Sequence, residues 1–139
     1  MDTRTVNYQL NGAVVYNIRM IDNSIPNTDK YARLAVEVAS DKLASDILLL
    51  DIREVGDFAD YFVLMTADSR RQLRSLSENL EDALEQSGGK RHHREGTPES
   101  GWMVLDFGDV VIHIFGPEER TFYDLDAMWS EGTEVVRIL

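Results

Sequence analysis

Two stretches of the chain place apolar residues at the three- and four-residue spacing of an amphipathic helix. The first is capped by Asn27 or Thr28 and runs to about Leu43, and the second runs from Ser69 to Gly88. The residues on the two apolar stripes are Tyr31, Leu34, Ala35, Val38, Leu43, Leu73, Leu76, Leu80 and Leu84. Because each stripe is one-sided, both helices are expected to bury one face against a core.

Four further segments have the apolar character of strands. Residues 47–52 and 61–66 are continuous apolar runs, which favours strands covered on both faces. Residues 102–107 and 110–115 flank Gly108-Asp109, a pair typical of a two-residue hairpin turn. A last helix is expected over roughly residues 121–129. The order of elements predicts an α/β fold, a mixed-sheet sandwich with flanking helices.

The predicted hairpin has two different faces. A two-residue turn sets Phe107 opposite Val110, and side chains then alternate along both strands. One face is wholly apolar and is expected to be core: Met103, Leu105, Phe107, Val110, Ile112 and Ile114. The other is mixed: Trp102, Val104, Asp106, Val111, His113 and Phe115. The mixed face fits a half-hydrated contact surface, or a surface covered by the last helix with Asp106 and His113 hydrogen-bonded internally.

The N-terminal 25 residues carry no functional signal. Asn11-Gly12 fits either a hairpin turn or a loose extension, and Met20 could be the true start of translation. We therefore divide the chain into an N-terminal extension of unknown role, residues 1–25, and a single domain, residues 26–139.

Composition narrows the class of protein. The chain has 139 residues, enough for one domain with its own core, and it has no cysteine for disulfides or thiolate metal ligands. No apolar run reaches the roughly 20 residues of a membrane helix, and no basic segment followed by an apolar one marks a secretory signal. A cytoplasmic protein without a membrane partner is expected.

The charge is acidic and uneven. The net charge is −11, which disfavours nucleic acid as the primary ligand and favours a basic protein partner or solubility alone. Residues 95–139 hold ten acidic residues against two arginines, whereas residues 69–94 hold four acidic and six basic residues. The acidity is therefore concentrated in the C-terminal third, with a basic segment before it.

The sequence offers little for catalysis. Metal-dependent nucleotidyl transfer needs two carboxylates on one face of a strand, but Asp109 falls in the hairpin turn while Asp106 lies on a strand. His92 and His93 are adjacent and would point to opposite faces of a strand, and the chain has no phosphate-binding glycine loop. We expect no metal, no cofactor and no enzymatic activity. A metal-dependent nucleotidyl or phosphoryl transferase is the alternative.

Several motifs, in this order and spacing, resemble the ribosomal silencing factor (Iojap) family. They are Asp60-Tyr61-Phe62, Thr66-Ala67-Asp68-Ser69-Arg70-Arg71-Gln72, Glu95-Gly96, Trp102, the segment Asp106-Phe107-Gly108-Asp109-Val110-Val111-Ile112-His113-Ile114-Phe115, Arg120-Thr121-Phe122-Tyr123-Asp124-Leu125 and Trp129. The resemblance covers about residues 31–129. It departs mildly at Ala67, Asp126 and Met128, where the family commonly has Gly, Glu and Leu.

The resemblance implies a nucleotidyltransferase-like fold without catalytic carboxylates. It also implies binding to the large ribosomal subunit through ribosomal protein fourteen, a steric block to joining of the small subunit, repression of translation under nutrient limitation, and self-association as a homodimer.

The residues expected to bind the partner are Trp102, Asp106, His113, Tyr123 and Trp129, with Arg120 orienting a carboxylate. Tyr123 and Trp129 fit a core position equally well. Arg70, Arg71 and Arg74 lie in the first turns of a helix, where the helix dipole disfavours cations. They are either a solvated face or a secondary contact with ribosomal RNA or an acidic patch.

Overall fold

The computed structural model describes residues 8–10, 13–15 and 29–139. In this part of the chain eight strands form one sheet in the order β2-β1-β8-β3-β4-β7-β6-β5. The strands are β1 (Tyr8–Leu10), β2 (Ala13–Val15), β3 (Ser45–Asp51), β4 (Tyr61–Thr66), β5 (His93–Glu95), β6 (Trp102–Asp106), β7 (Val110–Phe115) and β8 (Thr133–Ile138). β4 and β7 pair in parallel, and the other neighbouring strands in this order pair antiparallel. The predicted mixed α/β sheet is therefore confirmed.

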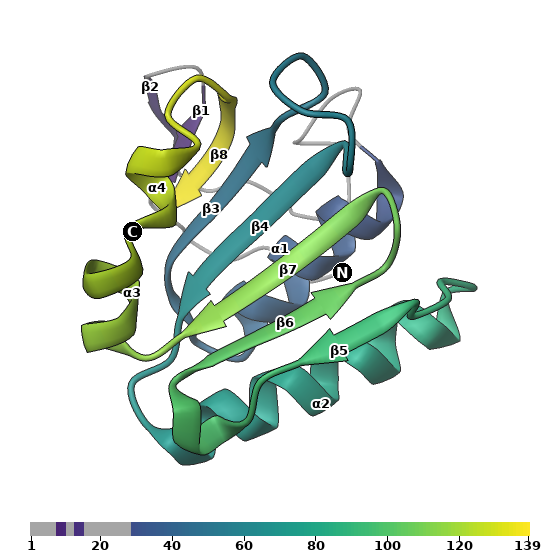
Figure 1. Ribbon diagram of the computed structural model, residues 1–139, viewed down its shortest axis with the longest axis vertical. Helices are drawn as coiled ribbons and strands as arrows, with labels where there is room; N and C mark the ends of the chain where they lie inside the picture. The colour runs from purple at the N-terminus through teal and green to yellow at the C-terminus, as the bar shows by residue number, and fades with distance from the viewer. Residues whose placement is uncertain (1–7, 11–12, 16–28) are drawn as a thin grey trace.

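Two long helices cover one face of this sheet (Figure 1). They are α1 (Lys30–Asp41) and α2 (Arg70–Gln86), the two amphipathic segments predicted above. Their apolar stripes meet inward-facing side chains of β3, β4, β6, β7 and β8 in the larger core cluster. That cluster contains all six residues of the predicted apolar hairpin face: Met103, Leu105, Phe107, Val110, Ile112 and Ile114.

The hairpin has the predicted register. Trp102 lies opposite Phe115 and Asp106 opposite Val111, and the Phe107 N–H donates to the Val110 carbonyl at 2.9 Å. Gly108 has φ +86°, a left-handed conformation in which glycine is unstrained, so the Gly108-Asp109 turn closes as expected. The two-residue connection fixes which side chains share a face.

The first helix begins and ends inside its predicted limits. Asp29 is the cap, because its Oδ1 accepts hydrogen bonds from the N–H groups of Tyr31 and Ala32 at 2.7 and 3.3 Å. The cap predicted at Asn27 or Thr28 is therefore wrong. The helix stops at Asp41, and Leu43 takes a left-handed φ of 65° that ends the helical path.

The last helix is two short helices rather than one. α3 (Pro117–Tyr123) starts earlier than predicted, because Pro117 is favourable in a first turn. Asp124, with φ 49°, breaks the helical path, and α4 (Leu125–Met128) follows with the Asp124 carboxylate as its cap. β5 and β8 were not predicted. The strand β8 lies between β1 and β3, so the sheet extends well beyond the four strands that the sequence indicated.

Residues 8–10 and 13–15 pair as an antiparallel ribbon, and β1 also pairs with β8. The predicted turn at Asn11-Gly12 and the alternative start at Met20 lie outside the described residues. The division at residue 25 stays a prediction.

Candidate functional site

The sheet face opposite α1 and α2 carries a smaller core and only a partial helical cover. In Figure 1 the short helices α3 and α4 lie along one side of the sheet, and neither α1 nor α2 crosses this face of β4, β7 and β6. The buried members of this cluster are Leu48, Leu50, Ile52, Ala59, Phe62, Leu64, Val111, Phe115 and Leu125. Trp102 and Trp129 pack against them and stay half-buried. The mixed face predicted for the hairpin is therefore part of a second, thinner core.

Rings form a continuous series over this face, which we call the aromatic row. Its members, in spatial order, are Phe58, Trp129, Phe62, His113, Trp102, Tyr123 and Phe122. Successive ring centroids are 4.6–6.0 Å apart, within the range of favourable aromatic contacts. The row joins the loop before β4 to α3 through the centre of the sheet.

Both ends of the row are open to solvent. Phe58 is 63% exposed at one end, and Phe122 and Tyr123 are 80% and 42% exposed at the other. Met128, beside Trp129 in sequence, is 70% exposed. Single exposed apolar residues are common on monomeric proteins, whereas apolar side chains joined in one contiguous series are typical of a surface that binds a partner. Sequence reasoning missed Phe58, Phe122 and Met128, although Phe122 stands within one of the recognised motifs.

The centre of the row holds a hydrogen bond between two predicted site residues. Trp102 Nε1 donates to His113 Nδ1 at 3.2 Å. His113 is only 7% exposed, and burial lowers the pKa of its imidazole to about 4. His113 therefore lies beneath the surface as a neutral side chain. Trp102 is half-buried and lies closer to the surface. The rings of Phe62, Trp102 and Phe115 pack around the His113 imidazole, and its part in partner binding stays a prediction.

Asp106 occupies a half-buried position near the hairpin turn. Its Oδ1 accepts the N–H of Gly108 at 2.8 Å, so the carboxylate stabilises the turn that defines the hairpin. Its second oxygen accepts no hydrogen bond in the described part of the chain. Asp106 thus combines a local structural role with an accessible negative charge.

Arg120 is 8% exposed and holds the outer helices on the sheet. Its guanidinium binds both carboxylate oxygens of Asp126 at 2.9 Å and donates to the Asp46 carbonyl at 2.8 Å and to Thr66 Oγ1 at 3.0 Å. Although burial opposes the ionised form, these contacts with Arg120 keep the pKa of Asp126 below its usual value. The guanidinium thus orients the Asp126 carboxylate within this chain, and the part of Arg120 in partner binding stays a prediction.

Both arginines of the acidic C-terminal third form ion pairs. Arg137, on β8, contacts the carboxylates of Asp46 and Glu134, and Arg120 contacts Asp126 as described. Glu118, Asp124 and Glu131 stay exposed around α3 and α4. The surface beside the aromatic row is therefore acidic, with its cations already neutralised.

The basic segment is partly neutralised as well. Arg70 pairs with Glu119 at 3.2 Å, and Arg74 pairs with Glu99 at 3.3 Å. The Arg70 hydrogen bond lowers the pKa of Glu119. Because Glu119 lies in the first turn of α3, the pair links that helix to the start of α2. Arg71 is exposed and has no ion pair within residues 29–139, so it is the most available of the three arginines.

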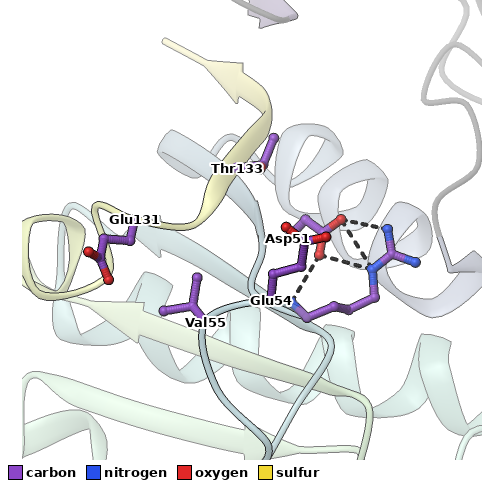
Figure 2. Close-up of a pocket in the computed structure, with 6 residues that line it drawn as sticks. Asp51, Glu54, Val55, Glu131 and Thr133 are labelled. Carbon is purple, nitrogen blue, oxygen red and sulfur yellow. Dashed lines mark hydrogen bonds and ion pairs between the residues drawn. The ribbon is translucent and has the colours of Figure 1, made fainter.

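A hollow of about 450 Å³ lies at the end of β3 that is near Trp129. Asp51, Glu54, Val55, Glu131 and Thr133 line it with Arg53, and Figure 2 shows their side chains around the loop. Arg53 forms a tight ion pair with Asp51, and this contact lowers the pKa of Asp51.

Within the described residues no three His, Asp or Glu side chains are grouped as metal ligands, and none of the helices is long and apolar enough to cross a membrane.

The fold and this face define a small mixed α/β protein whose second sheet face carries a row of rings bordered by exposed acidic side chains. The family model described as "Ribosomal silencing factor during starvation" matches residues 25–138. The ribosomal silencing factor of Bacillus subtilis is 32% identical over 106 residues, which are 76% of this chain and 90% of that protein. The chloroplastic protein Iojap of Arabidopsis thaliana is 35% identical over 130 residues, covering 89% of this chain and 54% of that protein.

Solved structures agree with these relationships. The crystal structure of a protein from Chromobacterium violaceum has a TM-score of 0.70 and 31% identity, covering 73% of this chain and 84% of that one. A structure from Bacillus halodurans has a TM-score of 0.63 and 29% identity, covering 70% of this chain and 90% of that one. The chain belongs to the ribosomal silencing factor family, whose members are ribosome-associated regulators of translation.

Proposed function

We propose that this protein binds the large ribosomal subunit through ribosomal protein fourteen and sterically blocks joining of the small subunit. Translation is thereby repressed when nutrients are limited. The bound protein acts by occupying space at the subunit interface, so it needs a stable contact and no chemical step.

The observation that carries this proposal is the aromatic row with its exposed ends. A standard protein interface buries about 1,600 Å² in total, and a few large apolar residues supply most of the binding energy. Phe58, Phe122, Tyr123 and Met128 offer such residues at the surface, and Trp102 and Trp129 support them from half-buried positions. These residues are suited to anchor the protein on its partner.

The charge around the row supports a basic protein as that partner. Glu118, Asp124 and Glu131 are exposed near α3 and α4, and Asp106 presents a carboxylate on β6. Complementary charge speeds encounter and orients the two surfaces, while the apolar anchors determine how long the complex lasts. Direct contacts are therefore assigned to Trp102, Asp106, Tyr123 and Trp129, with His113 and Arg120 acting from beneath the surface.

We propose a regulatory rather than an enzymatic role on a nucleotidyltransferase-like fold. Asp106 and Asp109, the two carboxylates of the hairpin, are unsuited to hold metal ions together. Asp109 lies in the exposed turn, and Asp106 accepts the Gly108 N–H. A secondary contact with ribosomal RNA is assigned to the basic start of α2, chiefly to Arg71. A cytoplasmic location and a homodimer stay predictions.

The proposal is tested by sedimentation of purified protein with isolated ribosomal subunits at low salt. We expect the wild-type protein to sediment with large subunits and not with small ones, and to bind purified ribosomal protein fourteen. Trp102→Ala is expected to weaken both interactions. If the large subunits sediment and the wild-type protein stays in the supernatant, the proposal is overturned.

A further inference from the structure

Trp102 is held in one orientation from several directions. Its indole stacks on Phe115 with a centroid distance of 5.1 Å and lies 4.6 Å from the ring of Tyr123. Its Nε1 donates to His113 Nδ1 across the hairpin. The ring contacts fix the plane of the indole, but only the hydrogen bond distinguishes its polar edge from its apolar edge.

This hydrogen bond determines the tautomer of His113. An indole N–H can only donate, so the imidazole Nδ1 that it meets must carry no proton. The proton of the neutral ring is therefore on Nε2. Nε2 is buried without a hydrogen-bond partner in the described part of the chain.

An unpartnered buried N–H is unusual and costs stability. A phenylalanine or leucine at position 113 would fill this site beside Phe62 and Phe115 and would bring no buried donor of its own. What an apolar residue could not supply is the acceptor for Trp102. The unpartnered Nε2 of the imidazole thus lowers stability, whereas Nδ1 accepts the hydrogen bond from the Trp102 indole.

We infer that His113 is a positioning residue that acts through Trp102, holding the indole in the orientation in which the aromatic row meets its partner. The inference rests on the proposed docking function. His113 makes no contact with the partner itself, because it is 7% exposed and the rings of Phe62, Trp102 and Phe115 surround it. Its contribution to binding is therefore expected to pass entirely through the indole.

The tautomer is tested on the free protein by nuclear magnetic resonance. Long-range ¹H–¹⁵N correlation is expected to show His113 with its proton on Nε2. The chain has two tryptophans, so Trp102→Phe assigns the Trp102 indole signal. That signal is expected to move upfield in His113→Phe and to stay near its wild-type position in His113→Asn, whose side-chain oxygen can accept the bond. A proton on Nδ1 would overturn the inference.

The positioning role is tested by a double-mutant cycle on large-subunit binding. His113→Phe is expected to weaken binding about three- to tenfold, the worth of one hydrogen bond, and to have no further effect in a Trp102→Phe background. His113→Asn should restore part of the loss. An equal loss from His113→Phe with and without Trp102 would overturn the inference, since the effect would then be structural.

The two proposals fail in distinguishable ways. If the wild-type protein does not bind large subunits, the docking function fails, and with it the role of His113 in binding, whatever the tautomer. If the wild-type protein binds but His113→Phe binds equally well, only the positioning role fails. Amide spectra of each variant establish that it is folded, and Trp102→Phe, which leaves the imidazole intact, removes the hydrogen bond by a second route.

Discussion

Arg120 binds Asp126 through two parallel hydrogen bonds, Nε to Oδ1 and Nη2 to Oδ2, each 2.9 Å long. The pair joins α3 to α4 across the break at Asp124. Because Nη1 of the same guanidinium reaches the Asp46 carbonyl and Thr66 Oγ1, it also fastens both short helices to β3 and β4. One buried arginine therefore supports the two helices that carry the exposed side chains of Phe122, Tyr123 and Met128.

Arg120→Ala should lower the free energy of unfolding by about 3–5 kcal/mol, because it removes both short hydrogen bonds to Asp126, leaving only the 3.7 Å ion pair with Arg137, and takes the donor from the Asp46 carbonyl and Thr66 Oγ1. Urea denaturation measures the change. Arg74→Ala is the matched control, since Arg74 pairs with Glu99 where both side chains are exposed. That variant should lose less than about 1 kcal/mol. Equal losses in the two variants would contradict the structural role of Arg120.

Gly96 and Gly88 both have positive φ, +87° and +97°, but their surroundings differ. A Cβ at Gly96 would overlap the carbonyl oxygen of Trp102, whereas a Cβ at Gly88 would meet only Tyr31 Oη at 3.4 Å. Gly88→Ala is expected to cost about 1 kcal/mol for the left-handed backbone alone. Gly96→Ala should cost about 3 kcal/mol or more, because β5 and β6 must also move apart. Thermal unfolding of both variants checks this order, and a Gly88→Ala loss as large as that of Gly96→Ala would contradict it.

The buried imidazole of His113 should make stability depend on pH. Its pKa is about 4 in the folded protein and about 6.5 when unfolded, so between these values the unfolded chain binds more protons. The contribution of the neutral imidazole to the free energy of unfolding is complete above pH 6.5 and is lost as the pH falls toward 4. Between pH 7 and pH 5 the wild-type protein should lose about 2 kcal/mol more than His113→Phe. Chemical denaturation at the two pH values measures this, and parallel pH profiles would show that His113 does not titrate in this way.

Exposed apolar residues should separate binding from stability. Phe122→Ser removes a ring that is 80% exposed, so the protein's free energy of unfolding should change by less than about 0.5 kcal/mol. Its affinity for large subunits should fall at least about tenfold if Phe122 is an anchor. Leu43→Ser is the control, since Leu43 is 81% exposed outside the aromatic row. Equal affinities of the two variants would remove Phe122 from the docking surface.

The hairpin was the most predictable part of the site. A two-residue turn at Gly108-Asp109 leaves one register, and alternation along the strands then assigns every side chain to a face. The identity of the core face followed directly, since all six of its residues were apolar. The sequence could not show how deeply the mixed face is buried, because its cover comes from distant segments.

The contacts of Arg120 illustrate the same limit. The sequence predicts that Arg120 orients a carboxylate, but its partners also include the carbonyl of Asp46, 74 positions away in sequence. β8 escaped prediction because Glu134 and Arg137 interrupt its apolar residues. The break at Asp124 was missed because a left-handed aspartate between two helical turns has no periodic signal.

Subunit joining, followed by light scattering, tests the central claim most directly. Purified large subunits are incubated with the protein before small subunits are added, and the rise in scattering reports ribosome formation. We predict that the wild-type protein suppresses this rise in proportion to its occupancy, and that Phe122→Ser suppresses it much less at the same concentration. A normal rise with large subunits saturated by bound wild-type protein would contradict the proposed steric block.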